Sequence, residues 1–301
     1  MRESGVLAFV ITVLVLGATV MTARSMVMAG STQLHTAMEA IAATLAFIAG
    51  VVSLVRHQTR DDSVFLLIGA GFFATAVLDG YHAIVTADGI AQQLPSTLSS
   101  LNSWSWLASR LCLSICLYLS WLAWNEPDRG RSISDAKIYL GVGSLTLASL
   151  LFFAVVPLPS AYVPNWVLHR PAELLPAIFF TLALIGYIVK ADWRTDVFDR
   201  MLICSLFVAV AMQIVVMPLS SQILDGMFNL GHLLKIASYT LVLGGLIGSI
   251  SCAFSDVRRL GEKQDATIQQ LAVANEGLEA FVRSSSHDLK APLRHVSSFC
   301  G

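Results

Sequence analysis

The sequence is poor in charged residues. Asp, Glu, Lys and Arg make up only 13% of its 301 residues, whereas 55% are hydrophobic and the mean hydropathy is +0.70. Ordinary soluble domains carry about 25% charged residues. This composition excludes a typical soluble protein and predicts a polytopic membrane protein.

Cysteine is also scarce, and its placement excludes a disulfide framework. All five cysteines fall in predicted membrane spans or on the predicted cytoplasmic side, namely Cys112, Cys116, Cys204, Cys252 and Cys300. Cys112 and Cys116 share a helix face, which favours small thiols at a helix contact over a metal-binding pair. The net charge of −1 and the lack of a basic cluster with aromatic residues give no reason to propose nucleic acid as a partner.

Long hydrophobic runs are what the chain has in abundance. Eight are long enough to cross a hydrocarbon core of about 30 Å, at residues 5–23, 33–55, 63–86, 104–124, 137–158, 172–190, 197–219 and 229–253. The first begins near Arg2 like a signal peptide, but its length and the poor cleavage site at residues 21–24 favour a membrane helix. We expect an all-α fold, with an eight-span membrane bundle followed by a cytoplasmic coiled-coil helix and the first helix of a dimerisation and phosphoacceptor hairpin.

Basic residues segregate if these eight spans alternate in direction. Two lie on one side, Arg24 and Arg170, and twelve on the other: Arg2, Arg56, Arg60, Arg129, Arg131, Lys137, Lys190, Arg194, Arg200, Arg258, Arg259 and Lys263. The segregation predicts a multi-pass protein of the bacterial inner membrane with both termini cytoplasmic. The longest outer loop, 87–103, is too short for a folded domain, and Trp104, Trp106 and Trp166 are expected to anchor spans at the outer interface.

Ionisable residues inside the spans gather in the predicted outer half of the bilayer. Each costs about 2.5–3.5 kcal/mol to insert, so each needs a reason. Many are spaced three or four apart, which places them on one helix face. The candidate ligand-binding or sensing residues are His35, Glu39, Asp79, His82, Arg110, Glu173, His232 and Lys235, with His169 near Glu173.

Three interpretations of this cluster stay open. Glu39 and Asp79 could pair with Arg110 and Lys235 in a structural network, or the cluster could bind a small polar or anionic ligand. Histidines and carboxylates from several helices also resemble metal sites, which makes a metal or haem a third candidate, with His35, Glu39, Asp79, His82 and His232 as ligands. The fixed charge of Lys235 opposes tight cation binding.

Residues 254–286 change abruptly to a charged helical pattern. A heptad frame places Val257, Gln264, Leu271, Leu278 and Ser285 at one seam position and Leu260, Thr267, Ala274 and Phe281 at the other. The frame predicts a parallel two-stranded coiled coil, and hence a homodimer. The polar middle either fixes the register or allows two registers that a shift of the last span could select.

The segment Ser284 to Arg294 resembles the phosphoacceptor box of sensor histidine kinases. His287 would be the nucleophile, with Asp288 orienting the ring and taking its proton. Pro292 would bend or loosen the helix after the reactive turn. Ala291 stands where many such kinases carry Thr or Asn, which leaves phosphatase activity toward a partner open.

No glycine-rich phosphate-binding loop occurs in the sequence. Phosphoryl transfer needs a positioned nucleotide and metal ion, so we expect ATP and Mg²⁺ to be bound by a catalytic domain of a longer kinase, and this chain alone to be inactive. The resemblance to histidine kinases implies a response regulator as partner.

Five segments resemble the multi-span sensor domains of the MASE type, which bacteria attach to histidine kinases and diguanylate cyclases. They are residues 34–39, 67–73, 78–82, 170–174 and 231–235. The expected organisation is a sensor domain at 1–253, a signalling helix at 254–283 and the start of the phosphotransfer domain at 284–301. The alternatives are a transporter-like domain and an inert membrane anchor, each fused to a kinase.

Overall fold

The regular secondary structure of the described residues consists of helices. The computed structural model describes Gly17 and residues 30–299, apart from 61–62, 88, 126–133, 164 and 191. All the regular elements within those ranges are helices, which confirms the all-α prediction. Within the described part of the chain, seven helices are long and apolar enough to cross a membrane. The first predicted span, 5–23, lies outside the described residues except for Gly17.

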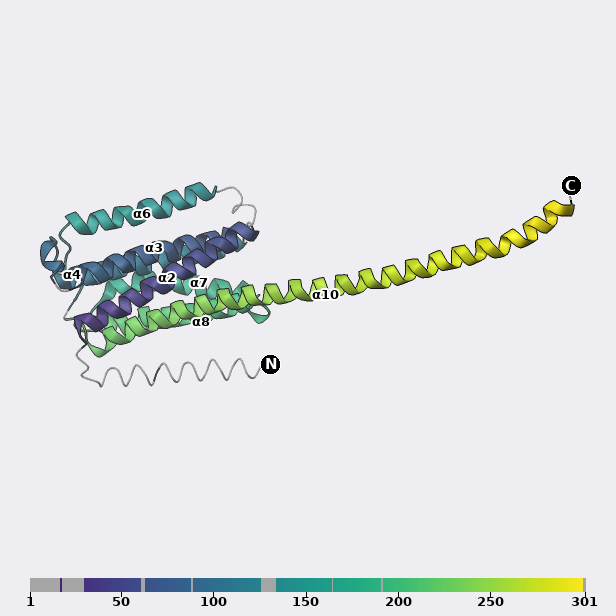
Figure 1. Ribbon diagram of the computed structural model, residues 1–301. Coiled ribbons are helices and arrows are strands. Elements are labelled where there is room, and N and C mark those ends of the chain that lie inside the picture. The colour runs from purple at the N-terminus through teal and green to yellow at the C-terminus, as the bar shows by residue number, and fades with distance from the viewer. Residues whose placement is uncertain are drawn as a thin grey trace. The chain divides into compact units, whose positions relative to one another are not determined.

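The helices follow the predicted spans closely (Figure 1). In chain order they are α2 (Thr32–Arg60), α3 (Ser63–Val85), η1 (Ala91–Gln93), α4 (Leu98–Asn125), α6 (Asp135–Val155), η2 (Pro171–Glu173), α7 (Leu174–Lys190), η3 (Asp192–Arg194), α8 (Val197–Ala211), η4 (Met212–Val216), α9 (Met217–Leu219) and α10 (Gly226–Phe299). The η4 segment is a π-helix that continues α8 into α9.

The outer loop at 87–103 is shorter than predicted, because α4 begins at Leu98. Its first turns carry Ser100, Asn102 and Ser103, which are polar but buried. Their polarity favoured a loop at the sequence level. In the structure they are buried in the first turns of a helix.

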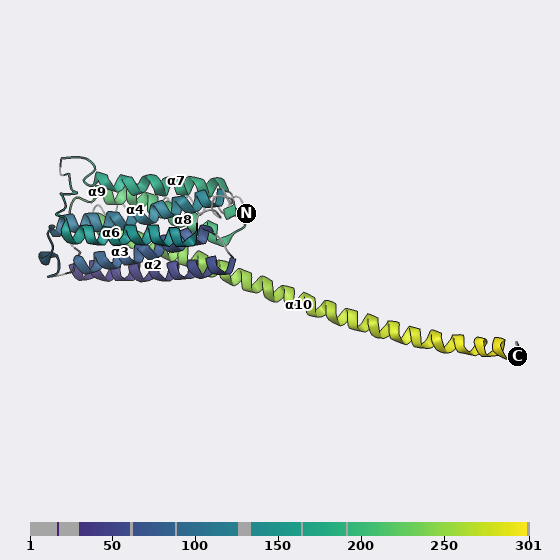
Figure 2. The ribbon, with the colours of Figure 1, turned by 90° about the horizontal axis from the view of Figure 1, so that it is seen from above.

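Close helix contacts form the membrane bundle (Figure 2). α3 lies against α2, α4 and α6, while α7 lies against α4 and α8. The backbones of α2 and α3 approach at two glycines. A Cβ at Gly50 would lie 2.9 Å from the backbone nitrogen of Phe73, and one at Gly69 would lie 2.7 Å from the side chain of Leu54. Small residues permit this close approach between membrane helices.

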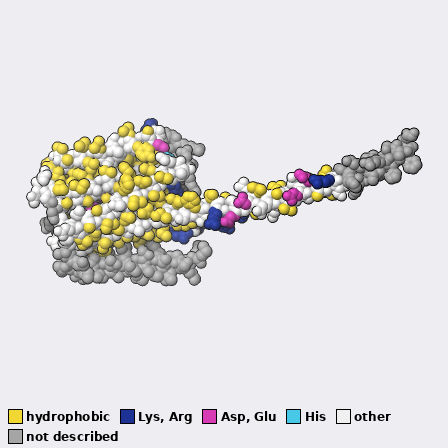
Figure 3. Space-filling model, in the orientation of Figure 1, with side chains coloured by type: hydrophobic (Ala, Val, Ile, Leu, Met, Phe, Trp, Pro, Cys, Tyr) yellow, Lys and Arg dark blue, Asp and Glu magenta, His cyan; other side chains and the backbone are white. Residues whose placement is uncertain are grey.

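The surface of the bundle is apolar, as one face of it shows in Figure 3. α6 lies at the edge of the bundle, where Leu140 and Val155 expose 71% and 73% of their surface. Contiguous apolar exposure of this kind suits contact with lipid. Together with the seven apolar helices, it indicates a membrane protein.

The chain divides into two compact units, of which the first ends at Gly248 and the second begins at Ser249. The helix α10 contributes to both, and it continues without a break through Pro292 to Phe299. Apolar residues of the predicted heptad seam are exposed on it, including Val257, Leu260, Leu271, Leu278 and Phe281.

Candidate functional site

Ionisable side chains from four helices meet at one end of the bundle. This is the end at which α2 and α10 begin and α3 ends. No side chain of the group exposes more than 2% of its surface: His35, Glu39, Asp79, His82, Arg110, His232 and Lys235. The structure therefore brings together seven of the eight residues that the sequence singled out, and we call them the buried cluster.

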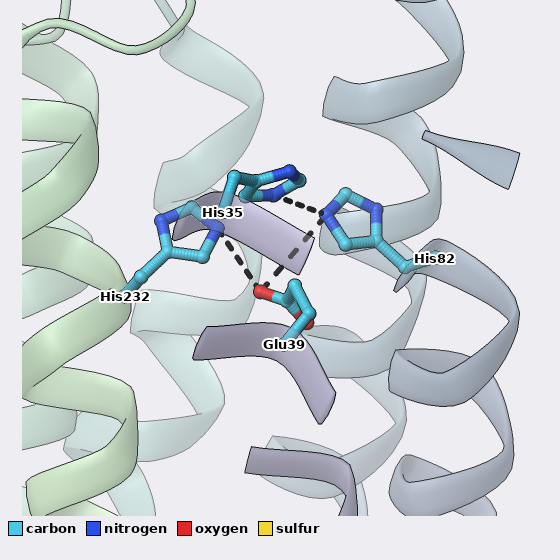
Figure 4. A group of neighbouring side chains, drawn as sticks. All are labelled: His35, Glu39, His82 and His232. Carbon is cyan, nitrogen blue, oxygen red and sulfur yellow. Dashed lines mark hydrogen bonds and ion pairs between the residues drawn. The ribbon is translucent and has the colours of Figure 1, made fainter. Parts of the chain in front are cut away.

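Glu39 on α2 is the centre of one half of the buried cluster (Figure 4). Lys235 Nζ on α10 donates to both of its carboxylate oxygens, at 2.6 and 2.5 Å. Its Oε1 lies 3.0 Å from His232 Nε2 and 4.0 Å from His82 Nε2. His82 Nε2 is in turn 3.3 Å from His35 Nε2. One carboxylate thus joins three helices.

Asp79 on α3 is the centre of the other half. Arg110 lies 3.2 Å from its Oδ2, Ser109 donates to Oδ1 at 2.5 Å, and the Tyr239 hydroxyl donates to Oδ2 at 3.1 Å. Arg110 also donates to the Tyr239 hydroxyl. Lys235 Nζ is 3.5 Å from Asp79 Oδ1, so it joins the two halves.

Two histidines of the buried cluster are oriented through their Nδ1 atoms. His232 Nδ1 donates to the backbone carbonyl of Phe228 at 2.7 Å. His82 Nδ1 lies 2.7 Å from the hydroxyl of Ser105. In both rings Nε2 is directed toward the other members of the cluster (Figure 4).

Glu173, the eighth predicted residue, lies beside the buried cluster. Its carboxylate accepts from Trp106 Nε1 at 3.2 Å and pairs with Arg170 at 2.8 Å. The indole of Trp106 extends from there to the cluster, where Lys235 Nζ is 4.6 Å from its ring centroid. Such a contact between a cation and an aromatic face is attractive.

One prediction about this region was wrong. Trp106 does not anchor its helix at the membrane interface, because its side chain is 1% exposed and packs within the bundle. Arg170 lies in the predicted loop between two spans, where it is equally buried and pairs with Glu173. Beside it, burial raises the pKa of Tyr162. The Trp104 indole, predicted to anchor a span at the interface, donates a hydrogen bond to the Pro159 carbonyl at 2.8 Å.

Sequence reasoning missed several polar residues that complete the site. Tyr239 lies four residues after Lys235, and Trp106 four residues before Arg110, so helical spacing could have found both. Ser105 and Ser109 carried no signal, because serine is common in membrane helices. His169 lies in the loop before η2, where its backbone N–H donates to the Pro218 carbonyl at 2.8 Å.

The charges within the buried cluster are balanced. Glu39 and Asp79 lie beside Lys235 and Arg110, which is the pairing expected of a structural network. Three imidazoles lie beside this network. One ring nitrogen of each and a Glu39 oxygen form a group whose atoms all lie within 4.8 Å of one another. Chemically, the arrangement can hold a cation, exchange a proton or fix the helices together.

The segment Ser284 to Arg294, predicted to be a phosphoacceptor box, lies on α10, the helix that also carries His232 and Lys235. The structure places His287 and Asp288 within this helix, and their side chains lie outside the described ones.

Comparison with known families gives one match. The family model of MASE3, a membrane-associated sensor domain, matches residues 28–249 and so includes the whole buried cluster. No HisKA domain was detected, so the phosphoacceptor assignment depends on the sequence of the box. No curated protein and no solved structure matches the chain.

Proposed function

Because the chain belongs to the MASE3 family of membrane-associated sensor domains, we propose that it is the sensory part of a histidine kinase in a two-component system. The membrane bundle detects a signal and controls phosphorylation of His287. The full-length kinase uses ATP and Mg²⁺ and passes the phosphoryl group to a response regulator.

One observation carries this proposal: a single helix contains two residues of the buried cluster and also the candidate phosphoacceptor box. His232 and Lys235 lie in the first turns of α10, and His287 lies further along the same helix. A helix is stiff along its axis, so a rotation or shift at its first turns is transmitted along it. A change in the contacts of Lys235 can therefore alter the position of His287.

The buried cluster also favours a sensor over an inert anchor. Seven ionisable side chains at 2% exposure or less are more than helix association requires, since small residues already join α2 and α3. Ionisable residues within membrane spans are usually functional. Detection at this site suits a bundle whose described loops are short.

The exposed seam of α10 supports a homodimer. Leu271 and Leu278 expose 65% and 60% of their surface in the single chain. A second copy of α10 in parallel would cover them, as in two-stranded coiled coils. Dimerisation would place the two phosphoacceptor boxes together in the kinase.

The test is autophosphorylation of the full-length kinase in lipid nanodiscs with Mg-ATP. His287→Gln should abolish the labelled phosphohistidine. Glu39→Gln should fix the output at one level, because it removes the negative charge and one of the two acceptor oxygens that join α2 to Lys235 of α10. The matched control is Asp192→Asn, whose side chain is 52% exposed and which should behave like the parent.

Two results would contradict the proposal. Labelling that persists in His287→Gln would refute the phosphoacceptor. Output that is the same in the parent, Glu39→Gln and Asp79→Asn would favour an inert anchor.

A further inference from the structure

Lone pairs converge at the centre of the buried cluster. His232 Nδ1 faces only a carbonyl oxygen, that of Phe228, so Nδ1 carries a proton. In the neutral ring Nε2 is then an acceptor, and it faces Glu39 Oε1 at 3.0 Å. Two acceptors at this distance repel each other unless a metal ion lies between them or Nε2 carries a second proton. Among the described residues, His232 Nε2 is buried and has no hydrogen-bond partner other than this Glu39 contact.

His82 shows the same arrangement. The Ser105 hydroxyl donates to the Leu101 carbonyl at 2.5 Å, the common bond of serine to the preceding helical turn. A hydroxyl has one proton, so toward His82 Nδ1 at 2.7 Å it accepts. His82 Nε2 is then unprotonated when the ring is neutral, and it faces His35 Nε2 and Glu39.

Imidazoles held in this way are typical of metal ligands. A ligating histidine usually donates its other ring N–H to a carbonyl, carboxylate or hydroxyl, which fixes the tautomer and orients the ring. Phe228 and Ser105 supply these contacts here. The Phe228 carbonyl lies four residues before His232 in the same helix, whereas Ser105 approaches His82 from a different helix.

The separations fit a small metal ion. In a tetrahedral site with bonds of about 2.0–2.1 Å, neighbouring ligand atoms lie about 3.4 Å apart. His82 Nε2 and His35 Nε2 are 3.3 Å apart, and His232 Nε2 and Glu39 Oε1 are 3.0 Å apart. His82 Nε2 and Glu39 Oε1 are 4.0 Å apart, and all four ligand atoms lie within 4.8 Å of one another. Binding an ion therefore requires the wider pairs to approach by about 0.6 Å to about 1.4 Å.

The geometry points to a binding site for a divalent first-row transition metal ion, with His35, Glu39, His82 and His232 as its ligands. Three imidazole nitrogens and one carboxylate oxygen suit borderline ions such as Zn²⁺ and Fe²⁺ rather than Mg²⁺ or Ca²⁺. This inference deepens the proposed function, on which it rests, by naming the chemical class of the signal.

Lys235 competes with the metal ion for Glu39. Its Nζ lies 2.5 Å from Glu39 Oε2 and 3.5 Å from Asp79 Oδ1. When an ion binds Glu39, repulsion displaces the ammonium group toward Asp79. Since Lys235 belongs to α10, this exchange changes the contacts of α10 from α2 to α3.

The experiment measures Zn²⁺ on the purified chain in detergent, by elemental analysis after removal of metal with a chelator and reloading. About one Zn²⁺ should bind per chain. His82→Gln and His232→Gln should each weaken binding by about tenfold to a hundredfold or more, because each removes one ligand. His57→Gln is the control, since His57 lies on the same helix as His35 but pairs with Asp135 at 2.8 Å outside the cluster.

Lys235→Met separates the metal site from a purely structural network. In the metal site, loss of the competing ammonium group should tighten Zn²⁺ binding by about tenfold or more. Co²⁺ loaded in place of Zn²⁺ should give the visible absorption of a four-coordinate centre, and this absorption should disappear in His232→Gln. Thermal unfolding of the parent with and without Zn²⁺ provides a readout that needs no variant, and bound ion should raise Tm.

The inference is overturned if the chelated parent binds no more Zn²⁺ than His82→Gln and its Tm does not respond to the ion. It is equally overturned if His57→Gln loses as much Zn²⁺ as the cluster variants do. Failure of the proposed function looks different: Zn²⁺ binds as expected, but autophosphorylation of the full-length kinase is the same with and without it. If the cluster binds no Zn²⁺ but its variants still fix the kinase output at one level, the metal site is refuted and the proposed sensor function is retained.

Discussion

At the residue scale, two carboxylates organise the buried polar interior of the bundle. Glu39 and Asp79 together accept from Lys235, Arg110, Ser109 and Tyr239. Neither carboxylate reaches water, so each depends on these donors for the solvation it lost on insertion. Lys235 lies within 3.5 Å of both, which makes it the residue whose position distinguishes alternative arrangements of the cluster.

Asp79→Asn should strongly destabilise the bundle. The substitution leaves Arg110 and Lys235 without one of their two counter-charges, and breaking a buried ion pair costs about 3–5 kcal/mol. Thermal unfolding in detergent should show a clear fall in Tm. Asp192→Asn, at a half-exposed carboxylate that lies 3.7 Å from Lys190, should change the free energy of unfolding by about 0–1 kcal/mol. Equal Tm values for the two variants would show that Asp79 is not a structural centre.

The sequence predicted which ionisable residues would meet, because charges in apolar spans are few and helical spacing assigns them to faces. It did not predict the pairing within the group. That pairing depends on how far each helix is rotated about its own axis. Sequence periodicity determines this rotation only coarsely. Trp106 illustrates the difficulty, because an indole near a span end also suits the membrane interface.

At the element scale, glycines determine how closely α2 and α3 approach. The space above Gly50 is filled by the backbone of α3 at Phe73, and the space above Gly69 by Leu54 of α2. Both helices also carry cluster residues near one end, His35 and Glu39 on α2, Asp79 and His82 on α3. The separation of these side chains is thus tied to the glycine contact further along the helices.

Gly50→Ala should force α2 away from α3, because the added Cβ meets backbone atoms that cannot rotate aside. We expect a lower Tm in detergent, and also weaker Zn²⁺ binding because the ligands from the two helices separate. Gly244→Ala is the matched control. It lies in helix α10, where an added Cβ meets nothing within 4 Å, and alanine should be neutral or stabilising by about 0.5–1 kcal/mol. A Gly50→Ala variant as stable as the parent would refute the close contact.

Element boundaries were predicted best where hydrophobicity changes sharply, as at Ser63 and Lys190. They were predicted worst at α4, whose first turns are rich in buried serine. The π-helix Met212–Val216 was not predicted either. Such a bulge leaves hydrophobic periodicity nearly unchanged, and here it directly precedes Pro218, which interrupts regular helix bonding.

At the scale of the whole molecule, α10 connects detection with phosphorylation in the proposed kinase. The helix begins at Gly226 and is continuous to Phe299. Its signalling segment presents an exposed apolar seam with polar residues Gln264 and Thr267 in the middle. Transmission along such a helix depends on its rotational phase.

Insertions after Gln264 in the full-length kinase test this dependence. Two added alanines rotate the remainder of the helix by about 200°, whereas seven rotate it by about 20° from the original phase. We expect the two-residue insertion to abolish the response of autophosphorylation to the Glu39→Gln substitution, and the seven-residue insertion to preserve it. If autophosphorylation of both insertion variants responds alike to Glu39→Gln, the signal is not transmitted by rotation of the helix or by a change in its heptad register.

The complete burial of the cluster also limits how fast a solute can reach it. Its side chains are sealed from both water and lipid, so a solute reaches them only while helices separate transiently, and such collective motions take microseconds to milliseconds or longer. Encounter with the outside medium is far faster than this opening. A detector built in this way averages over brief fluctuations in concentration and reports only conditions that persist.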